Sequence, residues 1–144
     1  TGIKVKVGGS EEWRVICAQH KNLEFAGREL LDESYCKAIC GCKISLCFLR
    51  KMNLDLQTTR TVEIPACGSF MLAERTSEHL EMFEDGKEAV FFETNQELLD
   101  KCKYYLLHER ERKQIAVAGH NRCELSGYSN SRRIKAIIEY VLNK

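Results

Sequence analysis

The feature that most constrains the fold is a series of short apolar runs separated by helical patterns. Residues 43–49 (KISLCFL), 69–73 (SFMLA) and 89–92 (AVFF) show no regular polar face. Strands of this composition are typical of parallel sheets that are buried on both sides. Residues 3–7 and 23–26 are expected to form two further short strands, each followed by glycine. The alternation of strands with helices predicts an α/β fold with a parallel sheet covered by helices on both faces.

Helix signals lie between these strands and dominate the C-terminal end. Asp32 or Ser34 is expected to cap a helix that continues to about Ile39. The other expected helices span residues 59–66, 76–83, 94–108, 109–125 and 129–142. The last of them carries an apolar stripe made of Ile134, Ile137, Ile138 and Val141.

Length and charge limit the number of domains and the kinds of partner that we expect for this chain. The 144 residues suit one domain, so residues 1–144 are predicted to form a single unit. Lysine and arginine number 22 against 21 acidic residues, a net charge of +1, which gives no reason to expect nucleic acid. No apolar run approaches the length of a membrane span, and the start of the chain does not resemble a signal peptide. We therefore expect a cytoplasmic protein, either processed or part of something longer.

Eight cysteines fit a reducing compartment better than a disulfide scaffold, because most of them lie within apolar runs. The tightest group is Cys36, Cys40, Cys42 and Cys47. Zinc or iron–sulfur ligation is one interpretation of this group. Paired C-x2-C spacing is missing, however, so burial as small apolar side chains is favoured and no metal is expected.

Two loops follow predicted strands, where ligands bind in open parallel sheets. Gly8 and Gly9 follow the first strand and allow a backbone to approach a ligand closely, although a bare turn has the same composition. A longer loop follows the KISLCFL run and leads into the helix that begins near Thr59.

The longer loop has the groups that a diphosphate needs. A helix N-terminus offers free N–H groups and the positive end of a dipole. Hydroxyls of Thr58 and Thr59 and the cations Lys51 and Arg60 add donors. Glu63, one turn inside the helix, has two acceptor oxygens suited to a ribose diol. A solvated charged loop with weak surface ion pairs is the competing interpretation.

A family resemblance favours the first interpretation. The segment RTVEIPACGSFMLAERTSEHLEMFEDGKEAVFF resembles the C-terminal half of GT-B glycosyltransferases, and is most similar to the CgeB-like spore-maturation group. The similarity covers the chain from about Leu23 onward. It implies a Rossmann-like domain with extra C-terminal helices, which is the donor-binding half of a longer two-domain enzyme.

The resemblance also implies roles for individual residues. Two acidic residues separated by seven positions flank the donor site in this group, and Asp55 and Glu63 occupy those positions here. Glu63 would bind the donor ribose, and the loop containing Thr58, Thr59 and Arg60 would face the diphosphate. Asp55 is one methylene shorter than the usual glutamate, which leaves its contact with the donor sugar open.

The implied reaction transfers a sugar from a nucleoside diphosphate to a hydroxyl acceptor, without a bound metal or other cofactor. Most catalytic residues would belong to the missing N-terminal domain, so the isolated chain is expected to be inactive. A non-catalytic nucleotide-binding or scaffold module with the same fold is the alternative. The sequence leaves open the sugar, the base, the acceptor, the anomeric outcome and the oligomeric state.

Other polar residues are expected to be structural. His20, His79, His108 and His120 do not have metal-ligand spacing, and all four are interpreted as surface or helix-face positions. Cys67 lies next to the predicted site without a nearby histidine in the sequence, so it is interpreted as a small packed side chain rather than a nucleophile.

Overall fold

The computed structural model describes residues 2–28 and 30–143. The chain divides into two compact units, residues 1–38 and residues 39–144. We call them the N-terminal unit and the C-terminal unit.

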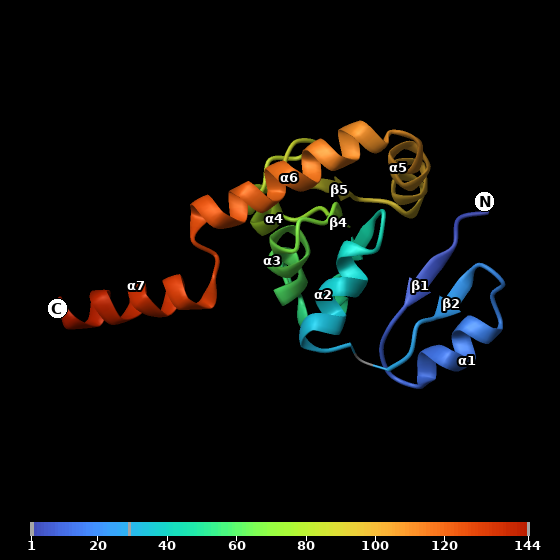
Figure 1. Cartoon of the computed structure of the whole chain (residues 1–144), viewed down its shortest axis with the longest axis horizontal. Coiled ribbons are helices and arrows are strands. Elements are labelled where there is room, and N and C mark those ends of the chain that lie inside the picture. The colour runs from blue at the N-terminus through green and yellow to red at the C-terminus, as the bar shows by residue number, and fades with distance from the viewer. Residues whose placement is uncertain (1, 29, 144) are drawn as a thin grey trace. The chain divides into compact units, whose positions relative to one another are not determined.

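The N-terminal unit contains a strand–helix–strand motif. Strand β1 (Val5–Val7) and strand β2 (Leu23–Phe25) pair in parallel, with Val5 opposite Leu23. Helix α1 (Glu12–Ala18) connects them (Figure 1). The two strands were predicted, but α1 was not, because its seven residues are too few to show a repeated helical pattern. A crossover helix is nevertheless what two parallel neighbouring strands require.

The C-terminal unit is built on a parallel sheet of three strands. These are β3 (Ser45–Cys47), β4 (Met71–Glu74) and β5 (Val90–Phe92), in the order β3-β4-β5. The register places Leu46 opposite Leu72 and Ala73 opposite Phe91. The predicted α/β fold with parallel strands and flanking helices is therefore confirmed, with the five strands divided between two sheets.

Apart from α1 and the 3-10 helix η1, which were not predicted, the helices match the predicted ranges to within one or two residues. Helix α2 spans Asp32–Cys40 and crosses the division between the units. The others are the 3-10 helix η1 (Lys51–Asn53) and helices α3 (Thr59–Ala66), α4 (Ser77–Met82), α5 (Asn95–Leu107), α6 (Glu109–Ser126) and α7 (Asn130–Leu142). The hydroxyls of Thr76, Thr94 and Ser129 accept backbone hydrogen bonds at the starts of α4, α5 and α7, as their residue types indicate.

The sheet of the C-terminal unit is buried on both faces. Alternate side chains along β4 and β5 point to opposite sides. On one side a core cluster joins strand residues to α5 and α6, and it consists of Phe70, Leu72, Val90, Phe92, Tyr105, Ile115 and Ala116. On the other side the Phe91 ring stacks on His79 of α4, with ring centroids 5.5 Å apart. Two-sided burial explains why the strand sequences contain no regular polar positions.

Helix α6 packs closely on α3. A Cβ atom at Gly119 would lie 2.3 Å from the Glu88 carbonyl oxygen and 3.4 Å from Pro65 Cβ, so only glycine fits there without a shift of the backbone. His120 Nδ1 donates to the Ala66 carbonyl oxygen over 2.9 Å, and the Cys123 thiol lies 3.9 Å from the Val62 carbonyl oxygen. These contacts fix the middle and the C-terminal end of α3.

Helix α7 buries none of its side chains. Its predicted apolar stripe remains exposed, from 51% at Ile138 to 64% at Val141. Across the described residues, no helix is both long enough and apolar enough to cross a membrane.

Candidate functional site

The longer predicted loop begins where β3 ends. Lys51 opens η1 and is exposed, while Asp55 lies just beyond η1 and is partly buried. Between them, Leu54 adopts a left-handed backbone conformation with φ of 53°, which residues other than glycine rarely adopt. Such a conformation bends the chain tightly, and it is maintained only where surrounding contacts impose it.

The start of α3 lies at the carboxyl end of β3. Thr58 is the N-cap residue, and its hydroxyl lies 3.8 Å from the Sγ atom of Cys47, the last residue of β3. An Nη2 atom of Arg60 donates to the carbonyl oxygen of Phe48, the residue after β3, over 3.4 Å. Thr59 and Arg60 are exposed in the first turn, where backbone N–H groups have no partner within the helix. This arrangement combines donors and positive charge at the ligand-binding edge of a parallel sheet.

Glu63 lies one turn further along α3 and its side chain is exposed. Two residues after Glu63, Pro65 precedes the end of the helix, and the Gly68 N–H bonds to the Pro65 carbonyl oxygen over 2.8 Å. Gly68 has φ of 70°, a left-handed conformation that suits glycine after a helix end. The helix end expected at Ala66 is therefore confirmed.

The six predicted site residues outside the glycine loop lie on one continuous segment, from η1 to the second turn of α3. They are Lys51, Asp55, Thr58, Thr59, Arg60 and Glu63. Gly8 and Gly9 belong to the N-terminal unit, so their part in the same site stays a prediction. Within that unit, a Cβ atom at Gly9 would lie 3.1 Å from Trp13 Cδ1, so local packing already favours glycine there.

Helix α4 holds the loop in a way that sequence reasoning missed. The Thr76 hydroxyl donates to the Leu56 carbonyl oxygen over 2.7 Å and accepts from the His79 N–H over 3.1 Å. One side chain thus caps α4 and binds the loop that leads into α3. The position of Thr76 in the sequence indicates that it caps α4, but it does not indicate the bond to the Leu56 carbonyl.

His79 is fully buried, which corrects its interpretation as a surface or helix-face residue. Its Nδ1 atom lies 2.6 Å from the Glu74 carbonyl oxygen, and its Nε2 atom lies 2.9 Å from the Thr61 hydroxyl. A carbonyl oxygen only accepts, so Nδ1 carries the proton and the neutral ring accepts at Nε2. Burial lowers the pKa of His79, which favours this neutral form. The clue in the sequence is that a large apolar residue, Phe83, lies four residues further along the predicted helix.

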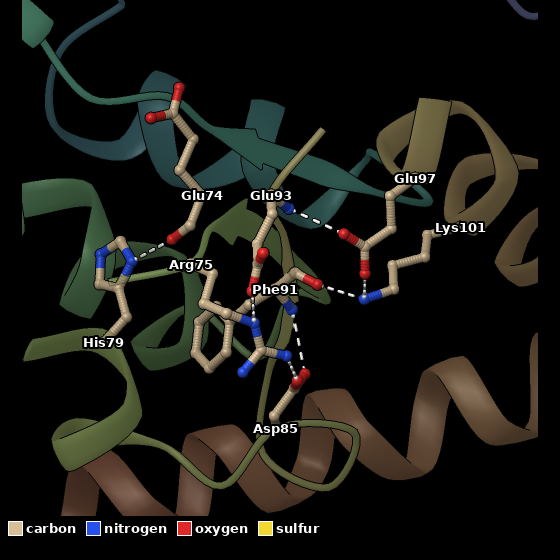
Figure 2. Close-up of polar contacts among 8 residues, drawn as sticks. All are labelled: Glu74, Arg75, His79, Asp85, Phe91, Glu93, Glu97 and Lys101. Atoms are coloured by element: carbon tan, nitrogen blue, oxygen red, sulfur yellow. Dashed lines mark hydrogen bonds and ion pairs between the residues drawn. The ribbon is translucent and has the colours of Figure 1, made fainter. Parts of the chain in front are cut away.

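Figure 2 shows a second polar cluster, beyond the carboxyl ends of β4 and β5. Arg75, directly after β4, forms ion pairs with Asp85 and, over 3.2 Å, with Glu93, directly after β5. Asp85 also accepts from the Phe91 N–H over 3.1 Å. Because two carboxylates neutralise Arg75, its role is to join the two strand ends rather than to bind an anion. In the sequence, the signal for this cluster was that charged residues follow closely after two apolar strand segments.

The same cluster continues onto α5. Lys101 pairs with Glu97 over 2.5 Å and also donates to the Phe91 carbonyl oxygen. The other Glu97 oxygen accepts from the Glu93 N–H over 2.8 Å (Figure 2). The start of α5 is thereby fixed to the end of β5.

The cysteines differ from their predicted burial. Cys47 is buried as expected, but Cys36, Cys40 and Cys42 are exposed, because the end of α2 buries only Ile39. The Cys40 thiol donates to the Cys67 carbonyl oxygen over 3.2 Å. In the part of the chain that the structure describes, no three histidine, cysteine or acidic side chains are grouped so that they could hold a metal ion.

Solved structures with a similar fold include HepE from Anabaena and the C-terminal domain of a glycosyl transferase. The structure of Anabaena HepE in complex with UDP and glucose matches with a TM-score of 0.72 at 14% identity, over 98% of this chain and 41% of that one. Its complex with UDP matches with a TM-score of 0.68 at 14% identity, over 99% and 41%. The C-terminal domain of the glycosyl transferase group 1 protein LpcC from Francisella tularensis matches with a TM-score of 0.54 at 17% identity, over 79% and 58%. The chain spans about two fifths of the length of HepE.

The sequence comparisons place the chain more directly. No curated protein matches it significantly. The model of the family described as glycosyl transferase-like, however, matches residues 1–139, nearly the whole chain. This match alone assigns the family, and the Rossmann-like fold shared with the solved structures agrees with it. The chain belongs to the glycosyl transferase-like family.

Proposed function

We propose that this chain is the donor-binding domain of a glycosyltransferase, which holds a nucleoside-diphosphate sugar whose sugar is transferred to a hydroxyl acceptor. One observation carries the proposal. Thr58, Thr59 and Arg60 begin α3 at the carboxyl end of β3, and Glu63 lies one turn further along the same helix. This arrangement lies within a chain that a glycosyl transferase-like family covers from residue 1 to residue 139.

The diphosphate binds at the start of α3. Hydroxyls of Thr58 and Thr59 and the backbone N–H groups of Thr59 and Arg60 donate to phosphate oxygens, and the helix dipole favours the negative charge. Lys51 and Arg60, both exposed, supply the positive charge. During transfer the departing diphosphate gains negative charge, and these fixed donors stabilise that charge without a metal ion.

The rest of the donor lies along the same segment. The Glu63 carboxylate accepts hydrogen bonds from the ribose hydroxyls, and Asp55 contacts the donor sugar. The glycine loop of the N-terminal unit, Gly8 and Gly9, stays a prediction from the sequence, based on the close backbone approach that glycine allows. UDP is the first nucleotide to test, because the HepE structures contain UDP, UDP-glucose, or UDP and glucose.

The complete enzyme has a second domain. The chain spans about two fifths of HepE, which leaves room for an N-terminal domain that binds the acceptor and supplies most catalytic groups. We assign the enzyme to the CgeB-like group, on the segment RTVEIPACG and the sequence that follows it. The eight thiols, three of them exposed, suit the cytoplasm.

Titration of UDP, ADP and GDP into the chain in the presence of a chelator tests the proposal. We expect one of them to bind without added divalent metal. Arg60→Gln and Lys51→Gln should each weaken binding by about 10- to 100-fold, since a hydrogen bond to a charged group contributes about 1.5–3 kcal/mol. Lys135→Gln, on the exposed helix α7, is the matched control and should bind like the wild type. Binding that requires magnesium, or equal effects of all three variants, would contradict this mechanism.

A further inference from the structure

A chain of hydrogen bonds runs from α4 to the first turn of α3. The Thr58 N–H donates to the Thr61 hydroxyl oxygen over 3.0 Å. The Thr61 hydroxyl donates to Nε2 of His79 over 2.9 Å, and Nδ1 of His79 donates to the Glu74 carbonyl oxygen over 2.6 Å. Thr61 and His79 are both 0% exposed, so water does not compete for these bonds. Every donor and acceptor in the chain has one orientation that satisfies its neighbours.

The ring of His79 has little freedom to move. Phe91 of β5 stacks on it with an angle of 8° between the rings. The sheet thus holds the ring from one side, and the end of β4 holds Nδ1 through the Glu74 carbonyl. The position of the Nε2 atom, and the direction in which it accepts a hydrogen bond, are therefore set by the sheet rather than by α3. The bond to Thr61 transmits that position to the start of α3.

The contacts along α3 divide it into two parts. Its first turn is held by the hydrogen bonds through Thr61 and, next to it, by the bond between Thr76 and the Leu56 carbonyl. The remainder is held by α6, through the close approach at Gly119 and the bond of His120 to the Ala66 carbonyl. Loss of the Thr61–His79 bond should therefore loosen the first turn while the rest of the helix stays in place.

We propose that His79 is a positioning residue of the donor site, which fixes the first turn of α3 in the orientation that binds the diphosphate. This inference rests on the proposed function and adds a specific role. His79 does not touch the donor. It acts through Thr61 on the N-cap residue Thr58, whose neighbours Thr59 and Arg60 face the phosphates. The ribose contact of Glu63 lies on the part of α3 that α6 holds, so it does not depend on His79.

Two pairs of variants separate this role from a general contribution to stability. His79→Gln places an amide oxygen near the position of Nε2, where it accepts from Thr61. His79→Asn places an amide nitrogen near Nδ1, where it donates to the Glu74 carbonyl but does not reach Thr61. Thr61→Ser keeps the hydroxyl, and Thr61→Val removes it at similar volume. Each pair thus contains one variant that keeps the bond to the N-terminal turn and one that loses it.

UDP and uridine are the probes. Uridine binding is measured from NMR chemical shifts, because this method detects weak binding. We expect His79→Asn and Thr61→Val to weaken UDP binding by about tenfold, because each loses one buried hydrogen bond and leaves its partner unpaired. Uridine affinity should stay unchanged in all four variants. His79→Gln and Thr61→Ser should recover most of the UDP affinity. The Thr61 pair gives the same test if a His79 variant fails to fold.

The outcomes are distinguishable. If the wild type binds UDP, but UDP and uridine weaken together in every variant, His79 only supports the fold and the inference is wrong. The same conclusion follows if His79→Gln loses as much UDP affinity as His79→Asn. If the wild-type chain binds no nucleoside diphosphate at all, the proposed function fails, and the role of His79 fails with it.

Discussion

At the scale of single residues, the buried ring of His79 links the stability of the domain to pH. Burial lowers the pKa of His79 from 6.5, while Glu74 and Glu78 oppose that shift only in part. Below pH 6.5 the unfolded chain therefore binds a proton that the folded chain resists, so stability falls as the pH decreases. Above pH 6.5 this contribution to the pH dependence disappears. For one proton the slope is at most about 1.4 kcal/mol per pH unit.

Urea unfolding at pH 7.5 and pH 5.5 measures the effect. The wild type should lose stability at the lower pH, and His79→Gln should lose less, because glutamine does not take up a proton. His20→Gln, at an exposed position, is the matched control and should keep the wild-type difference between the two pH values. An identical loss in the wild type and His79→Gln would show that His79 is not the group responsible.

Residue types and the family resemblance together predicted the candidate site. The loop cations, the threonines at the start of α3 and Glu63 were chosen because charge, hydroxyls and helix caps are visible in the sequence; the structure places them on one segment, and their roles stay predictions. His79 and Arg75 were not identified, because their roles depend on burial and on partners in other elements. A histidine on the same helical face as a buried phenylalanine, and charged residues just after strands, were the available signals.

At the scale of elements, Gly119 lets α6 pack closely against Pro65 of α3 and against Glu88, which precedes β5. Gly119→Ala should destabilise the domain by about 1–3 kcal/mol, because the added Cβ would overlap the Glu88 carbonyl oxygen and force the backbone apart. The better helix propensity of alanine, about 1 kcal/mol, works in the opposite direction and is outweighed. Denaturant unfolding measures the difference.

Gln114→Ala, exposed on the same helix, is the control and should change stability by less than about 0.5 kcal/mol. Equal or greater stability of Gly119→Ala would contradict the packing described here.

Most helices and strands were predictable because the sequence marks where they begin or end. Thr76, Thr94 and Ser129 mark helix starts, and buried strands are continuous apolar runs. The helix α1 was missed because a short helix with one buried residue leaves little periodicity to detect. The division of the strands into two sheets was also not predicted, since strand pairing depends on contacts distant in sequence.

At the scale of the whole molecule, the chain corresponds to about two fifths of HepE. We expect the 144-residue chain to bind a donor and yet to transfer no sugar, because the acceptor site and most catalytic groups belong to the proposed second domain. Incubation with UDP-glucose and a panel of hydroxyl acceptors, followed by mass spectrometry of the products, checks this. Turnover by the chain alone would show that its own residues complete the active site. A longer protein that binds the donor and still transfers nothing would favour the non-catalytic module.

The most direct test of the central claim concerns Glu63 and the ribose. Affinities of UDP, 2′-deoxy-UDP and 3′-deoxy-UDP are measured for the wild type, Glu63→Gln and Asp55→Asn, which closes a double-mutant cycle on one contact. We predict that removal of a ribose hydroxyl weakens binding to the wild type and to Asp55→Asn, but has almost no effect on Glu63→Gln. Glu63→Gln should also bind UDP about 10- to 100-fold more weakly than the wild type, and more weakly than Asp55→Asn does. If the penalty for the missing hydroxyl is the same in Glu63→Gln as in the wild type, Glu63 does not hold the ribose and the assignment of the donor site is wrong.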